Sequence, residues 1–359
     1  MTKVKNNMIE WRPIQIDSLF QEFVRGKVSS VIDETKDPNG IPYVGATIRN
    51  NGVLDFLVSD TEKKQRGNCI VFIRDGQGSV GLSVYRSTPF VATVNTSSGY
   101  SNWLNKYNGI FVSVSSNQVR VKYSFGYKRK EERLLSEKIM LPVNKKGQPD
   151  YNYMTKFLKE KQDDLLSKYI IFCKKQIKEI DFRKIPHLEE KHWIPISINS
   201  VFQLIRGREN NMALLNDGKM PLISAKKINN GLKGFVSTPN RPVQGNCISL
   251  NNDGDGGAGL AYFQPYEMAL DTHVTALIPK EKISKWSMLF ISECISKLHG
   301  FFGHGLSISN KRAEKIQIML PVNDVGQPDF EYMEQYAKNM MLKKYKQYLS
   351  FLERKEQKQ

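Results

Sequence analysis

Two glycine-rich loops are the segments of this sequence with the clearest potential for chemistry. They span Asp75–Gly81 and Asp253–Gly259, and each follows an apolar, strand-like run. A phosphate-binding loop leads into the N-terminus of a helix, and the Walker motif adds a lysine. Here each loop leads into a second strand-like run, Leu82–Tyr85 or Leu260–Phe263, and holds no lysine. The pattern favours two β-hairpin loops, which can still reach a nucleic-acid groove.

Other catalytic patterns are missing. The chain has no Asn-Pro-Pro-Tyr-like tetrapeptide, so the base-flipping pocket of an amino-methyltransferase is absent, and its histidines show neither HxH nor HExxH spacing. His299 and His304 lie five apart around glycines, which is typical of a loop. Asp150 and Asp329, each after a proline, open helical patterns, so we predict helix N-caps and not nuclease ligands. We expect no catalytic activity and no bound metal or cofactor in this chain.

The charge indicates an anionic partner. The 359 residues carry 53 Lys and Arg against 36 Asp and Glu, a formal net charge of +17. Each phosphate that a protein neutralises releases condensed counterions, so this excess favours nucleic acid. The basic residues are dispersed and form no cationic amphipathic segment at a terminus, which disfavours a membrane surface. A merely cationic, soluble surface is the alternative.

The remaining composition suggests a cytoplasmic protein. No run of about 18 apolar residues occurs, and the N-terminus lacks the apolar core of a signal peptide. Four cysteines, Cys69, Cys173, Cys247 and Cys294, lie far apart without a CxxC pair. Cys69 and Cys247 sit in apolar runs, so we predict buried free thiols there.

The chain is a duplication of one module. Equivalent segments recur in the same order with nearly constant spacing: Trp11–Ile14 and Trp193–Ile196, Val24–Gly26 and Ile205–Gly207, Ile41–Ala46 and Met220–Ala225, Asn50–Gly52 and Asn229–Gly231, Gly67–Ile70 and Gly245–Ile248, Ile139–Asn144 and Ile318–Asn323, Gly147–Asp150 and Gly326–Asp329. Two copies predict a pseudo-twofold molecule, because a solenoid needs about three.

Each copy reads as mainly β. The strand-like runs of the first copy are separated by Gly, Asn and Asp, which is turn chemistry: Tyr43–Ile48, Cys69–Ile73, Val80–Tyr85 and Phe90–Val94. Long helical patterns follow, from Tyr151 to about Ile180 and from about Phe330 to the end. Thirty residues of helix span about 45 Å. A helix of that length needs a partner, most simply the other long helix in an antiparallel coiled coil.

The predicted fold class is therefore α+β. Two pseudo-symmetric units, residues 1–150 and 188–329, are expected to be mainly β with short helices. Two spacer helices, residues 151–187 and 330–359, are expected to separate them. Together with the charge, this arrangement suggests two DNA contacts at a fixed separation.

The repeated motifs resemble those of the DNA-specificity subunits of restriction–modification systems. The Gly-Asn-Cys-Ile, Ile-Met-Leu-Pro-Val-Asn and Gly-Gln-Pro-Asp segments each occur twice, the last before a long helix. The similarity is to type I specificity subunits and to the smaller type IIB, BcgI-like ones, over nearly the whole chain. It implies that each unit is a target recognition domain that reads half of a bipartite site in double-stranded DNA.

The resemblance also implies partners. Residues 151–183 and 330–357 would set the gap between half-sites and dock adenine methyltransferase subunits, which would carry the S-adenosylmethionine. A restriction subunit is a further partner that it allows. Whether the system is type I or type IIB stays open.

Candidate base contacts follow from side-chain chemistry, because the resemblance supplies no fixed set. Arg and Lys suit guanine, whereas Asn and Gln suit adenine. The candidates in the first unit are Arg49, Asn50, Arg74, Gln77, Arg86, Lys128, Arg129 and Lys130. Those in the second are Lys226, Lys227, Asn229, Asn252, His304, Asn310 and Lys311. Equivalent positions of the two copies hold different residues, Arg74 and Asn252 at one position and Arg49 and Ile228 at another, which predicts that the units read different half-sites. Shared residues are expected to serve the frame, and differing ones the DNA.

Three alternatives remain. The chain could be a stand-alone DNA-modifying or DNA-cleaving enzyme with an unrecognised site, or an adaptor that uses its helices for protein contacts only. An RNA-binding role is weakened by the few exposed-looking aromatic residues that could stack on bases.

Overall fold

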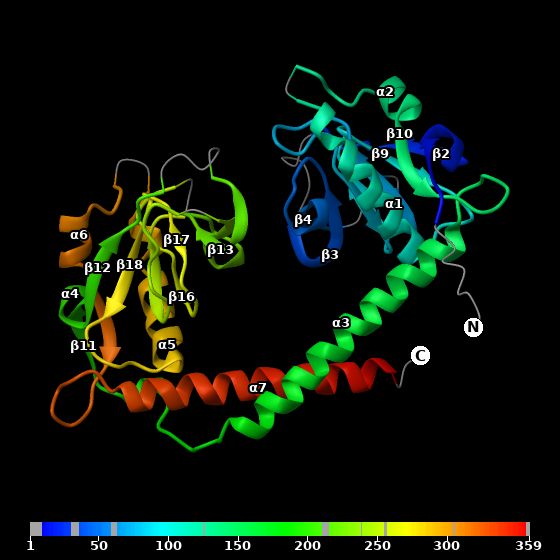
Figure 1. The fold of residues 1–359 in the computed structure, drawn as a ribbon. Coiled ribbons are helices and arrows are strands. Elements are labelled where there is room, and N and C mark those ends of the chain that lie inside the picture. Colours follow the sequence, from blue (N-terminus) through cyan, green and yellow to red (C-terminus); the bar gives the residue numbers. More distant parts are fainter. Residues whose placement is uncertain are drawn as a thin grey trace, which may run out of the picture. The chain divides into compact units, whose positions relative to one another are not determined.

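The structure is a computed structural model, which describes residues 9–29, 36–58, 63–124, 126–209, 215–237, 239–254, 257–303 and 306–356. The chain divides into two compact units, Met1–Lys168 and Tyr169–Gln359. Helix α3 (Tyr151–Glu179) begins in unit 1 and ends in unit 2 (Figure 1).

Unit 1 contains ten strands and two short helices among its described residues, before α3. The strands are β1 (Trp11–Gln15), β2 (Glu22–Arg25), β3 (Lys36–Val44), β4 (Val53–Leu57), β5 (Lys64–Gln65), β6 (Cys69–Ile73), β7 (Ser83–Arg86), β8 (Phe90–Ala92), β9 (Thr96–Tyr100) and β10 (Lys138–Pro142). The helices are α1 (Lys106–Gln118) and α2 (Glu131–Ser136). The strands form sheets of order β2-β9-β6-β7 and β4-β3-β8-β5 and a ribbon of β1 with β10.

Strand β6 shows how the layers of unit 1 are built. Its five residues are all buried, and successive side chains of a strand point to opposite faces. Cys69 and Val71 pack toward the second sheet, in a core shared with Val44 and Phe90. Ile70 and Phe72 pack the other way, in a larger core with residues of α1, of β10 and of the start of α3. The sheet β2-β9-β6-β7 is therefore the middle layer, buried on both faces.

Unit 2 repeats this plan. Its strands are β11 (Trp193–Ser197), β12 (Phe202–Arg206), β13 (Asp217–Ile223), β14 (Leu232–Val236), β15 (Cys247–Asn251), β16 (Ala261–Gln264), β17 (Ala269–Leu270), β18 (Val274–Pro279) and β19 (Gln317–Pro321). Its helices are α4 (Ile198–Val201), α5 (Lys285–Ser296), α6 (Asn310–Lys315) and α7 (Phe330–Glu356). The sheets β12-β18-β15-β16 and β14-β13-β17 and the ribbon β11-β19 correspond to those of unit 1. The observed α+β units with a repeated topology confirm the predicted fold class.

The motifs that repeat in the sequence close each unit. The tryptophan strand pairs antiparallel with the Ile-Met-Leu-Pro strand, with Trp11 opposite Pro142 and Trp193 opposite Pro321. The Gly-Gln-Pro-Asp segment then ends in a helix cap. Asp150 Oδ1 accepts the Tyr153 amide at 2.9 Å, and Asp329 Oδ1 accepts the Tyr332 amide at 2.9 Å. Both predicted N-caps are confirmed.

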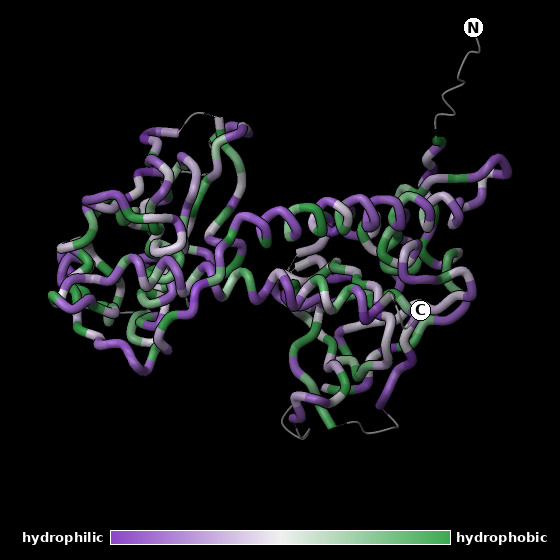
Figure 2. Tube along the Cα trace, turned by 90° about the horizontal axis from the view of Figure 1, so that it is seen from below, coloured by the Kyte–Doolittle hydropathy of each residue, from purple (hydrophilic) through white to green (hydrophobic). Residues whose placement is uncertain are grey.

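Within unit 2, the last part of α3 packs antiparallel to α7. The ring of Tyr169 meets that of Tyr348 with 5.0 Å between centroids, and Phe172 meets Tyr345 at 5.9 Å. Cys173 is buried in the same cluster. Figure 2 shows hydrophilic and hydrophobic residues interspersed along both long helices, as expected for helices with one buried stripe. The predicted antiparallel pairing therefore holds for this part of α3.

The first turns of each long helix have a different role. Met154 of α3 is fully buried in the core of unit 1, and Met333 of α7 is fully buried in the core of unit 2. Each long helix is therefore anchored at its start in the module that precedes it. The boundaries of the predicted domains stay a prediction. No helix among the described residues is long and apolar enough to cross a membrane.

Candidate nucleic-acid interface

In unit 2, several loops gather at the end of the middle sheet that lies away from α7 (Figure 1). Arg206, at the end of β12, donates from Nε to the carbonyl oxygen of Thr272 at 2.8 Å. The carbonyl oxygen of His273 accepts the Asn252 amide, and that of Asn252 accepts the Ile308 amide. These bonds fix the loop after β12, the β17–β18 turn, the glycine-rich loop and the segment before α6 as one surface.

The same loops meet in unit 1. The Arg25 Nε, at the end of β2, lies 3.4 Å from the carbonyl oxygen of Val94. The Arg74 amide donates to Asn95, and the Arg129 amide donates to the carbonyl oxygen of Arg74. Lys128 extends this surface through an ion pair of 2.6 Å with Asp75. The two units therefore present equivalent loop clusters.

Both glycine-rich loops are hairpins, as predicted. Strand β6 pairs antiparallel with β7, and β15 pairs antiparallel with β16. Residues 255–256 of the second loop lie outside the described part of the chain.

Among the described residues, no group of three or more His, Cys, Asp or Glu is placed to hold a metal ion. His299 lies in a short 3-10 turn, where Nδ1 is 2.6 Å from the Ala258 carbonyl oxygen.

The Asn-Asn-Gly turns are a surface feature that both units share. Asn50 and Asn229 adopt left-handed backbone angles, with φ of 48° and 54°, which asparagine tolerates better than most residues. The next residue is braced from the neighbouring hairpin. Arg86 Nη1 donates to the Asn51 carbonyl oxygen at 3.3 Å, and Gln264 Nε2 donates to that of Asn230 at 2.9 Å. Arg86 is thus half-buried, and this desolvation lowers its pKa.

Eight of the predicted contact residues have exposed side chains. They are Arg49, Asn50, Gln77, Lys128 and Lys130 in unit 1, and Lys227, Asn229 and Lys311 in unit 2. Lys226 is half-buried, and its Nζ donates to the Leu232 carbonyl oxygen at 3.1 Å. His304 lies outside the described residues. Asn310 begins α6, but its side chain is also outside the described part. The exposed side chains remain candidate base contacts.

The prediction for Arg129 is wrong. Its side chain is 0% exposed, in the core between the middle sheet and α1. Nη1 donates to the Gly81 carbonyl oxygen at 3.1 Å and to Ser83 Oγ at 3.0 Å. Nη2 donates to Ser116 Oγ at 2.8 Å and to the carboxylate of Glu137. A guanidinium held in this way stabilises the frame and cannot reach a base.

Arg74 and Asn252 occupy equivalent positions, and both are buried. Arg74 is 8% exposed, and its Nη2 donates to the Val94 carbonyl oxygen at 2.8 Å. Its burial and the positive charge of nearby Arg25 lower its pKa. Asn252 is 1% exposed, and its Oδ1 accepts the hydroxyl of Thr275 at 3.0 Å. The predicted base contacts at these two positions are corrected to loop supports, because both side chains face inward.

Sequence reasoning missed the cations beside the repeated glycine of β2 and β12. Arg25 and Lys27 flank Gly26, and Arg206 and Arg208 flank Gly207. The arginine–glycine match identifies the duplication, and its cations are not among the predicted base contacts. The signal that would have found these residues is a cation retained on both sides of the glycine in two otherwise different copies.

A sequence model for the type I restriction modification DNA specificity domain matches the chain twice, at residues 8–170 and 190–349. The chain belongs to this family. The match confirms the resemblance inferred from the repeated motifs, and with it a role in DNA specificity. Each match covers one module together with most of its long helix, to residue 170 of α3 and residue 349 of α7.

Individual proteins that are similar to this chain are also specificity subunits. The chain is 24% identical to the specificity subunit S.BcgI of the type II restriction enzyme BgcI from Heyndrickxia coagulans, over 343 residues, 93% of this chain and 96% of the relative. Two solved specificity subunits have similar chains. The type I S subunit of M. genitalium is 19% identical with a TM-score of 0.49, covering 98% of this chain and 95% of its own. The HsdS subunit of Thermoanaerobacter tengcongensis is 13% identical with a TM-score of 0.31, covering 96% and 91%.

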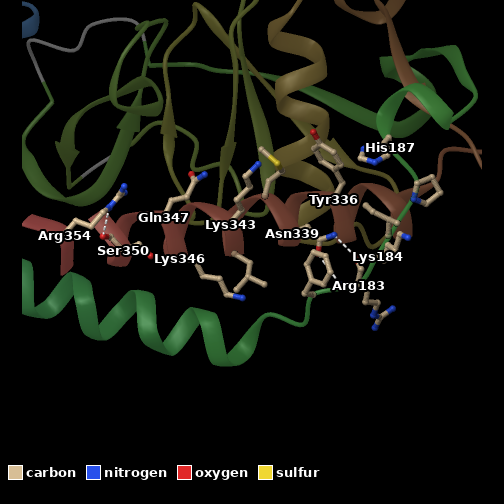
Figure 3. A pocket seen from close by; sticks show the side chains of 15 residues that line it. Arg183, Lys184, His187, Tyr336, Asn339, Lys343, Lys346, Gln347, Ser350 and Arg354 are labelled. Carbon is tan, nitrogen blue, oxygen red and sulfur yellow. Dashed lines mark hydrogen bonds between the residues drawn. The ribbon is translucent and has the colours of Figure 1, made fainter. Parts of the chain in front are cut away.

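The specificity chain also carries a groove along α7 in unit 2. The groove has a volume of about 760 Å³ and lies between α7 and residues 182–187 (Figure 3). Asn339 holds this segment by donating from Nδ2 to the Arg183 carbonyl oxygen at 2.7 Å. Several cations and no carboxylates line it: Arg183, Lys184, Lys343, Lys346 and Arg354. Phe182, which is exposed, adds apolar surface.

Proposed function

We propose that this specificity subunit directs an adenine methyltransferase to a split, asymmetric site in double-stranded DNA, and has no catalytic activity of its own. The observation that carries the proposal is a duplicated frame whose exposed loop residues differ between copies. Two equal frames support reading two half-sites in the same manner. Unequal side chains at equivalent exposed positions support reading different bases.

The exposed turn before the Asn-Asn-Gly segment supports the asymmetry. Arg49 is exposed in unit 1, where the equivalent residue of unit 2 is the exposed Ile228. An arginine is suited to the O6 and N7 acceptors of guanine, whereas an isoleucine offers only apolar contact, for example to a thymine methyl group. The following Asn50 and Asn229 are the same residue with nearly the same backbone angles. The turn is therefore a fixed platform on which one side chain has changed.

The long helices are the proposed docking surface for methyltransferase subunits. The groove along α7 is lined by cations, and exposed apolar residues such as Met340 and Phe351 lie on the same helix. Such a mixture suits a partner surface with acidic and apolar side chains. The methyltransferase would bind the S-adenosylmethionine, and a restriction subunit is a further partner of this proposal.

Methylation of plasmid DNA tests the proposal. The methyltransferase encoded beside this chain is assayed alone, with the chain, and with a chain in which unit 2 is deleted, and modified bases are mapped by long-read sequencing. We expect adenine methylation at a bipartite motif only with the full chain. Sequence-specific methylation by the chain without a methyltransferase would refute the non-catalytic assignment, and a palindromic motif would refute the asymmetric reading.

A further inference from the structure

A cationic pocket lies at the loop end of unit 2, beside the last residue of β12. It has a volume of about 510 Å³ and is lined by Arg206, Arg208 and Arg241, with Gln203, Leu204 and Ile205 along one side. No acidic residue lines it. None of the three arginines forms an ion pair with a carboxylate of the described residues. Three guanidinium groups around one pocket make a site for an anion.

The backbone holds these arginines in place. The Arg208 amide donates to the Leu270 carbonyl oxygen at 2.9 Å, and the Arg206 Nε is bonded to Thr272. Between them, Gly207 passes so close to the backbone of the β17–β18 turn that a Cβ atom would lie 2.0 Å from the Asp271 carbonyl oxygen. Only glycine fits such an approach. Arg208 and Arg241 are exposed, so their charged groups face solvent.

The neighbouring carboxylate does not neutralise the pocket. Glu209 follows Arg208 directly, but its side chain is 1% exposed and turns inward. Its two carboxylate oxygens accept hydrogen bonds from the backbone amide and the side-chain amide of Asn240, at 2.6 and 3.0 Å. The negative charge is thus bound within the loop, and the outer surface remains cationic.

Unit 1 repeats the backbone geometry of this site and the positions of its cations. The Lys27 amide donates to the Ala92 carbonyl oxygen at 3.0 Å, and the Arg25 Nε approaches that of Val94. A Cβ atom on Gly26 would lie 1.9 Å from the Thr93 carbonyl oxygen. Lys63 occupies the position of Arg241. Gln65 pairs with Phe90 in unit 1, and Val243 pairs with Met268 in the same way in unit 2. Lys63 lies two residues before Gln65, and Arg241 lies two residues before Val243. Each unit therefore places three cations at the same point of its frame.

We propose that these two sites, Arg206, Arg208 and Arg241 in unit 2 and Arg25, Lys27 and Lys63 in unit 1, bind backbone phosphates of the DNA. The inference rests on the proposed function. These cations occur at equivalent positions in both units, whereas neighbouring exposed residues differ between the units. Residues that are common to both units cannot distinguish the two half-sites, so their ligand must be common to both half-sites. The phosphodiester backbone is the common anion of every DNA sequence, and phosphate contacts fix the register in which bases are read.

DNA binding by the full chain, assembled with its methyltransferase, tests this inference. Duplexes with and without the recognised motif are titrated by fluorescence anisotropy between roughly 50 and 200 mM salt. The variant is Arg208→Gln/Arg241→Gln, because both side chains are exposed and donate no hydrogen bond to a described residue. The control is Lys282→Gln/Lys285→Gln, which removes the same charge from exposed positions beside the start of α5.

The expected result is a parallel loss of affinity for both duplexes. The slope of log K against log salt falls by about 0.9 for each phosphate contact removed, so by about 2 for the double variant. We expect affinity to fall by roughly tenfold or more, because hydrogen bonds to charged groups are among the stronger ones. The motif preference should stay unchanged, and the control should retain the full slope.

Three results would separate the possible failures. A variant with the affinity and salt slope of the control overturns the phosphate site while the proposed function stands. A variant that loses affinity only for the motif duplex also overturns it, because the arginines would then read bases. A parent chain that shows no preference for any DNA motif refutes the proposed function, and the inference with it.

Discussion

Five polar side chains at the centre of unit 1 have apolar counterparts in unit 2. The first set is Ser83, Ser116, Tyr123, Arg129 and Glu137, and the second is Ala261, Ile295, Phe302, Ile308 and Ile316. All five residues of unit 1 contact one another through Arg129 or Glu137. Four of those of unit 2 belong to one apolar cluster, and Phe302 packs against it. One frame thus holds an ionic core in one copy and a hydrocarbon core in the other.

Backbone contacts establish that these positions are equivalent. The Arg129 amide donates to the carbonyl oxygen of Arg74, as the Ile308 amide donates to that of Asn252. Asn117 binds the backbone of Ser83, and Ser296 binds the backbone of Ala261, each with both a donated and an accepted bond. The apolar residues of unit 2 therefore occupy the positions that the ionic and polar residues occupy in unit 1.

Removing one partner from the ionic core is expected to be costly. Glu137→Ile leaves the Arg129 guanidinium fully buried, and its remaining acceptors among the described residues are the neutral oxygens of Gly81, Ser83 and Ser116. The rings of Phe72 and Tyr123 lie 5.0 and 5.7 Å from it. Breaking a buried ion pair in this way costs about 3–5 kcal/mol of unfolding free energy. At about 2–4 °C per kcal/mol for a domain of this size, the unfolding midpoint of unit 1 falls by roughly 6–20 °C.

Replacing the whole set is expected to have the opposite result. The five substitutions S83A, S116I, Y123F, R129I and E137I transfer the core of unit 2 into unit 1. Exchanging a buried ionic group for well-packed apolar residues is neutral or stabilises by about 1–4 kcal/mol, because the desolvation of both charges is no longer required. The five-fold variant should thus be several kcal/mol more stable than the single variant Glu137→Ile.

Hydrogen exchange read by mass spectrometry measures this, because it reports β6 and β15 separately in a chain of two units. Glu132→Gln, an exposed change on α2, is the control and should lie within about 0.5 kcal/mol of the parent. The reasoning is refuted if Glu137→Ile is as stable as the parent chain, or if the five-fold variant is less stable than the single variant Glu137→Ile. The five-fold variant should also keep its DNA affinity, whereas a loss would restore Arg129 as a DNA contact.

Four further predictions follow from single features. Arg49→Ala should relax the recognised motif at one base pair, a change of about 1–3 kcal/mol seen by methylome sequencing, with the other half-site unchanged. Gly207→Ala should lower the unfolding free energy by about 1–3 kcal/mol in thermal melts, since its Cβ would collide with Asp271, and a wild-type melt would contradict the close approach. Leu342→Ala should cost about 2–5 kcal/mol and raise hydrogen exchange in α7, because this residue is buried against α3; unchanged protection would count against the helix pairing. Burial raises the pKa of Cys69 and of Cys247 from 9.0 to about 12, so neither thiol should react with iodoacetamide at pH 8 without denaturant, and unfolding free energy should fall as pH rises from 9 toward 12.

The sequence predicts well those elements whose signals are local. Strand β6 was predicted at Cys69–Ile73 and lies there, because a short apolar run between turn residues has few alternatives. The start of α3 at Tyr151 was predicted because an aspartate precedes a long 3.6-residue periodicity, and Asp150 caps it. The Gly, Asn and Asp residues between the predicted strands indicated turns, and the Asn-Asn-Gly segments are turns because asparagine and glycine tolerate left-handed backbone angles.

Elements determined by their surroundings were missed. Helix α1 contains a glycine, three serines and two valines, a composition of low helix propensity, and depends on an Asn105 capping box and on packing against the middle sheet. Strand β9 reads Thr-Ser-Ser-Gly-Tyr and has no apolar alternation, yet all five residues are buried between β2 and β6. The predicted base contact at Arg129 was wrong for the same reason, because the acceptors of its guanidinium come from other segments of the chain, which no local pattern reveals.

The duplication distinguishes frame from reading surface only when sequence difference and exposure are used together. Sequence difference between the copies alone predicts that Arg74 and Asn252 contact the DNA, although both side chains are buried. Arg129 and Ile308 also differ, but the reason is that the cores of the two units are filled with different side chains. Sequence identity between the copies alone predicts that the arginine–glycine segments serve only the shared structure of the units, although Arg25 and Arg208 are exposed cations. Positions that differ and are exposed, such as Arg49 and Ile228, are the ones expected to read bases. Exposed positions that keep their charge in both copies are expected to bind what both half-sites share.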